Sequence, residues 1–252
     1  MSTDAGDETD QGTHGTPAGP TGEHALGHPL PAVVDWLAAA VVALTGAAFL
    51  VGGTVLGLVV DRDMLAEGIE SGEITVVVFE RDLTQAEMLE FTLDVVRWTG
   101  WGLLAAGLGL LAVAVWFVVV RHRARARAGP DEAVGTFWAH AVYGAVASAV
   151  LSFVPFSEAV GGGLSGYLDA YRGGNPTAAG AVSGLLAVVA PLVVLAGVTV
   201  GLFAGLSSVG ESELGVLTSA AMVFVALLVV AYGAGLGALG GFVGGRLAHR
   251  DR

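Results

Sequence analysis

The chain has 252 residues, of which 54% are hydrophobic and only 13% are charged. Soluble domains carry about 25% charged residues, so lipid is the expected solvent for most of this chain. The net charge is −12, which disfavours nucleic acid as a partner. Cysteine is absent, which excludes disulfides and cysteine-ligated metals.

All 11 basic residues are arginines. Arginine without lysine, together with acidic polar segments and many alanines, glycines and valines, is typical of extreme halophiles, chiefly haloarchaea. GC-rich coding is the alternative explanation for the same usage. The first 29 residues contain five acids and no basic residue, and they predict a disordered acidic tail. Its three scattered histidines do not predict a metal site.

Residues 30–128 are predicted to form a unit with two membrane spans. The first span covers about 31–60, and an acidic outer loop follows at 61–92. Within this loop, residues 73–79 favour a short strand and Thr84-Gln-Ala-Glu87 is a capping box. The capping box predicts a helix that starts in the loop and continues as the second span to about Val120.

Four arginines in seven residues then follow the second span directly. Under the positive-inside rule they place this end of the span in the cytoplasm, next to anionic lipid headgroups. The residues that set this orientation are Arg121, Arg123, Arg125 and Arg127.

Residues 137–252 are predicted to form a glycine-rich membrane bundle. Full spans are expected at 137–154, 178–206 and 215–245. The apolar stretch at 159–171 is too short to cross about 30 Å of hydrocarbon as a helix without thinning the bilayer. It is either a short span or a re-entrant segment. The positive-inside rule favours the arrangement that puts both termini in the cytoplasm.

The stretch from Phe137 to Pro191 resembles an uncharacterised haloarchaeal multi-pass membrane family, one of the groups called domains of unknown function. The resemblance rests on Gly144-Ala-Val-Ala-Ser-Ala-Val-Leu-Ser-Phe-Val-Pro-Phe-Ser157, on Gly161-Gly-Gly-Leu-Ser-Gly-Tyr-Leu168, and on Gly180-Ala-Val-Ser-Gly-Leu-Leu186. It implies a helix that ends at a Pro-Phe-Ser turn, a returning glycine-rich segment and a further span. It implies no activity.

Glycine recurs at every fourth position in the last two predicted spans. Such faces let helix backbones approach closely, either between copies around a pore or within one bundle. The recurrence in several spans favours packing within one bundle. The predicted helix-packing residues are Gly197, Gly201, Gly205, Gly233, Gly237, Gly241 and Gly245.

Charged residues are expected only at the ends of the predicted spans. Glu158 is a candidate for a polar site in a turn, although a helix-capping role is the alternative. Asp94 and Arg97 are three residues apart and could pair where the second span enters lipid. No catalytic or metal-ligating constellation has useful spacing, so we expect no enzyme, no cofactor and no bound metal.

The sequence therefore predicts an all-α polytopic transmembrane bundle with five full spans plus one short glycine-rich span or re-entrant segment. Its expected place is the cell membrane, with both termini cytoplasmic. The expected function is a non-enzymatic structural or interaction role. Its partners would be the bilayer and either a second copy or another membrane protein. The alternative is a small-solute channel or facilitator assembled through the glycine-rich faces.

Overall fold

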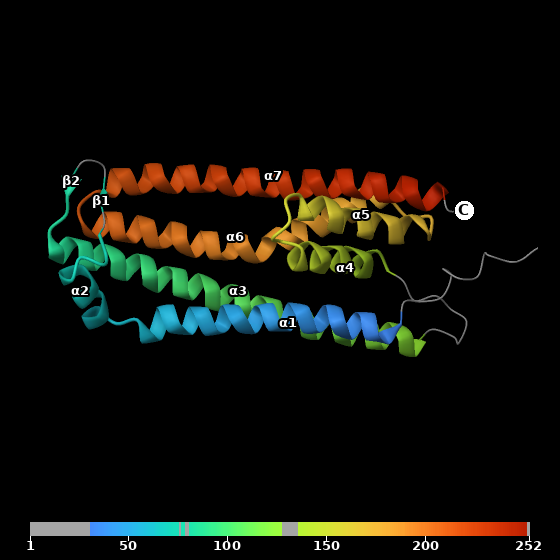
Figure 1. The fold of residues 1–252 in the computed structure, drawn as a ribbon, viewed down its shortest axis with the longest axis horizontal. Helices are drawn as coiled ribbons and strands as arrows, with labels where there is room; N and C mark the ends of the chain where they lie inside the picture. Colours follow the sequence, from blue (N-terminus) through green and yellow to red (C-terminus); the bar gives the residue numbers. More distant parts are fainter. Residues whose placement is uncertain (1–30, 76, 79–80, 128–135, 251–252) are drawn as a thin grey trace, which may run out of the picture.

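The computed structural model describes residues 31–75, 77–78, 81–127 and 136–250 of the chain, so the predicted acidic tail lies outside the described residues. Helices make up almost all of this part (Figure 1). The elements are α1 (Ala32–Thr54), the π-helical turn η2 (Val55–Val59), α2 (Arg62–Glu70), β1 (Val77–Val78), β2 (Arg81–Asp82), α3 (Gln85–Arg127), α4 (Phe137–Val150), α5 (Ser157–Ala170), α6 (Pro176–Ser208) and α7 (Ser212–Arg250).

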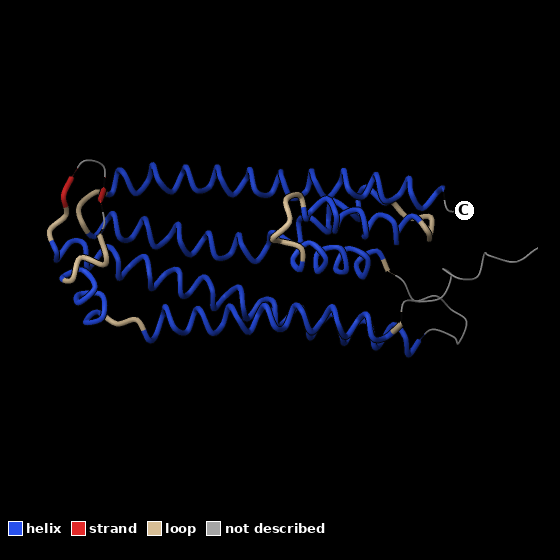
Figure 2. The backbone as a smooth tube through the Cα atoms, in the orientation of Figure 1, coloured by secondary structure: helices blue, strands red, loops and turns tan. Residues whose placement is uncertain are grey.

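The four long helices lie side by side in the order α1, α3, α6, α7. Each of them packs along the next one, and the short helices α4 and α5 pack against α6 and α7 (Figure 1). The short helices reach only about half of the length of the bundle. Loops are confined to the two ends of the bundle and to the α4–α5 turn, which is the tan segment near the middle of Figure 2.

The two ends of the bundle differ in character. We call one the cap end, because α2, β1, β2 and the turn between α6 and α7 lie there (Figure 1). We call the other the arginine end, because α3 finishes there with its arginine run and α7 finishes with Arg246 and Arg250. The start of α1 also lies at the arginine end. The first described helix therefore begins on the same side of the bundle on which the last one, α7, ends.

Local sequence signals fix the helix starts. The predicted capping box is confirmed: the Thr84 amide donates to Glu87 Oε2 at 2.9 Å, and the Glu87 amide donates to Thr84 Oγ1 at 3.3 Å. The Asn175 side chain caps α6 by accepting from the Ala178 amide at 3.1 Å, and Pro176 takes the first helical position. The helix of the second span therefore begins in the loop, as expected, and continues to Arg127.

The predicted strand is found in part. Among the described residues, Val77–Val78 and Arg81–Asp82 pair as a two-stranded antiparallel ribbon, whereas residues 73–75 of the strand predicted over 73–79 are not in it. Glu73 and Ile74 lie before the ribbon, and the Ile74 amide instead donates to the Gly68 carbonyl at 2.8 Å, which closes the end of α2.

The expected count of five full spans is not confirmed. In the described part of the chain, four helices are long and apolar enough to cross a membrane: α1 with η2, α3, α6 and α7. The stretch expected to be a full span at 137–154 forms only the 14-residue helix α4, which would extend about 21 Å. It turns at residues 151–156 and returns as α5, also 14 residues long. The glycine-rich segment is therefore the second arm of a half-length hairpin.

The turn of this hairpin contains a left-handed residue that is not glycine. Phe156 has φ 65° and ψ 26°, and its ring is exposed. A side chain in this region costs roughly 1–2 kcal/mol because Cβ approaches the following carbonyl. The turn reverses the chain within six residues and directs α5 back along α4.

Glycines lie at close approaches between the long helices. A Cβ added to Gly53 would lie 2.8 Å from the Gly100 carbonyl oxygen on α3, and one added to Gly197 would lie 2.7 Å from the Trp98 carbonyl oxygen. On α7, Gly237 and Gly241 meet the backbone of Gly180 on α6, whereas Gly240 and Gly244 meet α5. Gly240 and Gly244 thus lie against α5, whereas Gly237 and Gly241 lie against both α6 and α5, because Gly162 and Gly166 of α5 also approach them.

Candidate functional site

A buried carboxylate joins three helices at the arginine end. Asp35, in the first turn of α1, accepts from Arg121 Nε at 3.0 Å and from Arg125 Nη2 at 2.5 Å through its Oδ2 atom. Its Oδ1 atom accepts a short hydrogen bond from the Tyr143 hydroxyl on α4. The Asp35 and Arg121 side chains are 8% and 5% exposed, so neither charge is solvated by bulk solvent.

The spacing of these residues along their helices brings their side chains together. Arg121 and Arg125 are four residues apart near the end of α3, so both project from one face toward the start of α1. Tyr143 is held from the side by Phe117, whose ring packs edge-on against it with centroids 6.0 Å apart. Ala38 and Ala39 complete this cluster and leave room for the aromatic rings.

A second buried pair lies on the hairpin itself. His140 on α4 and Asp169 on α5 are 3.1 Å apart between Nδ1 and Oδ1, and their side chains are 4% and 6% exposed. Arg172 lies in the turn after α5. Burial, followed by the charge of Arg121, lowers the pKa of the Arg172 guanidinium from its ordinary value. The two buried pairs and Arg172 therefore belong to one electrostatic neighbourhood at the arginine end.

Buried hydroxyls continue from this pair along the hairpin. Ser148 on α4 donates to the Ser157 carbonyl at 3.2 Å, across the two arms. Ser165 Oγ, Ser183 Oγ and Asp169 Oδ2 are buried without a hydrogen-bond partner among the described residues. A serine hydroxyl in a helix can rotate to the carbonyl four residues earlier, so the two serines need no ligand to be satisfied.

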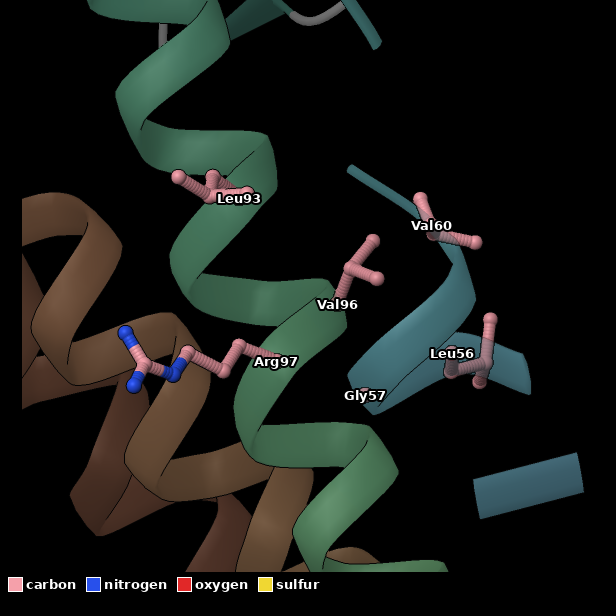
Figure 3. A pocket seen from close by; sticks show the side chains of 6 residues that line it. All are labelled: Leu56, Gly57, Val60, Leu93, Val96 and Arg97. Carbon is pink, nitrogen blue, oxygen red and sulfur yellow. The ribbon is translucent and has the colours of Figure 1, made fainter. Parts of the chain in front are cut away.

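The predicted polar-site residues do not come together. Glu158 lies in the first turn of α5 at mid-length of the bundle, where Ser157 Oγ donates to its Oε2 at 3.4 Å. Asp94 and Arg97 lie on α3 toward the cap end and form no ion pair with each other in the described part of the chain. Arg97 instead lines a small cavity of about 190 Å³ with Gly57 and Val60, and its side chain extends away from them (Figure 3).

Sequence reasoning missed the residues that the fold buries. Asp35 and Tyr143 are separated by 108 positions, and His140 and Asp169 by 29. The sequence did place Asp35 and the arginine run at the ends of two separate predicted helices. A charge near lipid is expected to be paired, which was the available signal. The four orientation arginines lie together at the end of α3, as expected from their sequence, and two of them bind Asp35.

The cap end carries the opposite charge. Two apolar clusters attach the cap to the bundle: Leu65 and Ile69 of α2 pack with Leu89 of α3, and Leu83 packs with Leu206 and Val209 at the end of α6. Arg62 adds an exposed ion pair to Glu90 at 2.6 Å. The acids of this segment remain exposed, and they are Asp61, Asp63, Glu67, Glu70 and Glu73.

Within the described residues, no group of three or more His, Asp or Glu side chains is arranged to hold a metal ion.

A comparison with known protein families finds a match in the part of the chain that contains the hairpin. A family model described as "Family of unknown function (DUF5518)" matches residues 138–247. The chain contains a DUF5518 domain there. This domain comprises α4, α5, α6 and most of α7, so it includes the hairpin and the glycine contacts of α7. No curated protein and no solved structure matches the chain.

The resemblance deduced from the sequence ended at Pro191. The DUF5518 domain continues past that residue through the second half of α6 and most of α7. A haloarchaeal origin stays a prediction. The four long apolar helices of the described part have the length and composition to cross a membrane, which suggests a membrane protein. The family description assigns no activity, so function has to be inferred from the geometry.

Proposed function

We propose that the chain is a non-enzymatic multi-pass protein of the cell membrane, and that it presents its acidic cap as a contact surface for a partner with a basic surface. The arginine end would lie in the cytoplasm under the positive-inside rule, and the cap would lie outside. The observation that carries the proposal is the cap, in which apolar residues are used for attachment and acids are left facing solvent.

The packing of α2 on α3 holds the acidic surface of the cap in a fixed position on the bundle. Leu65 and Ile69 are 6% and 7% exposed, so one side of α2 is committed to α3. The acids on the remaining sides are held at set positions instead of on a flexible loop. Complementary charge at fixed positions speeds association and selects partners of opposite sign.

The contacts of the glycine faces support this proposal over a channel assembled through them. Gly201 and Gly205 meet Val95 and Phe91 on α3, and Gly237 meets Gly180 on α6. Faces that are filled by helices of the same chain are not available to line a solute path or to join copies. A solute path would have to use other surfaces.

The test is site-specific photo-crosslinking in native membranes, with the crosslinker replacing Glu67 on the cap. The same group at Leu227, which is exposed on α7, serves as the control for contact with lipid and neighbouring proteins. We expect a discrete adduct from position 67 that disappears when Asp63, Glu70 and Glu73 are changed to their amides. The control position should give no such adduct.

Two results would contradict the proposal. One is an adduct from position 67 that persists at full yield after the acids are neutralised. The other is solute flux in reconstituted vesicles that the wild-type chain supports and that the amide variant retains, which would favour the channel alternative.

A further inference from the structure

Polar side chains form a continuous series inside the hairpin, from the arginine end to the α4–α5 turn. The series begins with the buried contact between His140 and Asp169. It ends with Glu158, whose Oε2 accepts from Ser157 Oγ at 3.4 Å. We call the whole series the polar line, and its members are His140, Asp169, Ser165, Ser183, Ser148, Ser157 and Glu158.

The first step of the polar line is a pair of serines one helical turn from the His140–Asp169 contact. Gly144 lies four residues after His140 on α4, and Ser165 lies four residues before Asp169 on α5. A Cβ added to Gly144 would contact both Ser183 Oγ and Ser165 Cβ, so the two serines meet α4 at one point. Both serines are 0% exposed, although they come from different helices.

The second step lies one turn further along α4, at Ser148. Its hydroxyl occupies the place that a Cβ on Gly161 of α5 would take, and it donates to the Ser157 carbonyl at 3.2 Å. Ser157 is 5% exposed, and its own hydroxyl reaches Glu158. From Asp169 to Glu158 the polar line follows eleven residues of α5, which is about 16 Å.

Glu158 lies well inside the bundle, and no basic side chain pairs with it in the described part of the chain. Gly240 of α7 meets the carbonyl of the next residue, Ala159, and lies six residues before Arg246, which is about 9 Å along the helix. An ionised carboxylate at such a depth is costly unless it is paired. Uptake of a proton removes this charge without a partner side chain.

The helices packed against α5 offer few other groups that could exchange a proton with Glu158. These helices are α4, α6 and α7. Helix α6 has no titratable side chain, and on α7 the titratable residues on either side of Gly240 are Tyr232 and Arg246. The remaining titratable residues of the hairpin are His140, Tyr143, Tyr167 and Asp169, and Arg172 follows in the turn after α5. Acid–base groups are therefore concentrated at the arginine end of the polar line.

The serines supply the connection that a proton needs between these ends. A hydroxyl both donates and accepts, and series of polar side chains serve as proton relays inside membrane proteins. Ser165 Oγ, Ser183 Oγ and Asp169 Oδ2 are buried without a partner in the described part, so each can bond to a water that joins it to the next member. Toward the cap, the second half of α6 has one hydroxyl before Ser207, on Thr199, which donates to the Leu195 carbonyl of its own helix.

We propose that Glu158 is a proton-binding site inside the membrane, and that the polar line gives it access to protons from the arginine end only. Proton uptake neutralises the α4–α5 turn where it lies in hydrocarbon. The charge of the turn is thereby coupled to the pH on one side of the membrane.

The test measures the reaction of Glu158 with dicyclohexylcarbodiimide, a lipid-soluble reagent that adds to protonated carboxyl groups and leaves a stable N-acylurea. The full chain is reconstituted in sealed vesicles of known orientation. The pH is stepped on one side, a brief pulse of reagent follows, and adducts are quantified by peptide mass spectrometry. Raising the pH at the arginine end should lower the Glu158 adduct by up to about tenfold per unit. The same step at the cap end should leave it unchanged.

Variants separate the acid from its access path. Glu158→Gln should remove the adduct. The double variant Ser165→Ala and Ser183→Ala deletes the first step of the polar line and should abolish the response to a pH step at the arginine end. Thr199→Val, which deletes a hydroxyl outside the polar line, serves as the matched control and should respond as the wild type does.

The wild-type measurement keeps the proposal falsifiable if the serine variant does not fold. The absence of a Glu158 adduct at every pH would overturn the proton site. An adduct that follows the pH at the cap end, or follows both sides equally, would overturn access from the arginine end. A folded serine variant with the wild-type response would overturn the role of the polar line.

Discussion

Asp35 and Arg121 lie 86 positions apart in the chain, yet Arg121 Nε is 3.0 Å from Asp35 Oδ2 in a site that solvent barely reaches. Arg125 and Tyr143 contact the same carboxylate. This carboxylate therefore connects the start of α1 to the end of α3 and to α4. It thus links α1 and α3 to the DUF5518 domain, which begins with α4.

Removing this carboxylate should destabilise the protein strongly. Asp35→Asn leaves Arg121 buried without its counter-charge, and breaking a buried pair in this way costs roughly 3–5 kcal/mol. Glu67→Gln, on the exposed side of α2, should change the free energy of unfolding by less than about 0.5 kcal/mol. Thermal unfolding in detergent compares the two variants. Equal midpoints would show that the Asp35 site does not hold the helices together.

The glycine contacts of α7 predict opposite effects for two neighbouring glycines. Gly237→Leu forces a side chain into the backbone of Gly180 and should lower the free energy of unfolding by at least about 1–3 kcal/mol. Gly235 has no atom within 4 Å of an added Cβ. Gly235→Leu should therefore be neutral or stabilising by up to about 1 kcal/mol through helix propensity. A similar loss in both variants would mean that the α6–α7 contact is not the one described.

The left-handed turn residue predicts a stabilising substitution. Phe156→Gly relieves a backbone conformation that disfavours side chains, and should raise the free energy of unfolding by about 1 kcal/mol. Phe153 is also exposed and has no positive φ. Phe153→Gly should lower the free energy of unfolding, because glycine there only raises the conformational entropy of the unfolded chain. Chemical denaturation in mixed micelles measures both, and a lower midpoint for Phe156→Gly would contradict the turn geometry.

The cap should loosen without loss of the membrane helices. Ile69→Ala removes a buried side chain from the contact between α2 and α3, at a cost of about 2–5 kcal/mol to that contact. Hydrogen exchange should accelerate in Arg62–Glu70 and stay unchanged in Pro176–Ser208. Faster exchange in both segments would show that the cap and the bundle unfold as one unit.

Much of the bundle could be predicted from the sequence because its signals are local. The capping box at Thr84, the position of the arginine run and the four-residue glycine spacing each act within one helix. The glycine spacing shows which faces are narrow, but not which helix each face accepts. For this reason the contacts that the glycines of α7 make with both α5 and α6 appear only in the structure.

The half-length hairpin and the buried pairs could not be predicted from local signals. Residues 137–154 are as apolar as a crossing helix, and their composition does not reveal that α4 ends at Val150 and turns at Phe156. The partners of Asp35 come from α3 and α4, and their meeting depends on how the helices pack. A charge at a predicted helix end looks interfacial until the partner that buries it is known.

The hairpin's depth is the central claim, and cysteine accessibility tests it most directly, because the native chain has no cysteine to interfere. Single cysteines replace Glu67, Arg123, Ser152 and Arg172 and are treated with a membrane-impermeant maleimide from either side of sealed vesicles. We predict that positions 123 and 172 react from one side, position 67 from the other, and position 152 from neither. Labelling of position 152 from the same side as position 67, or of position 172 from that side, would contradict a hairpin that turns inside the membrane.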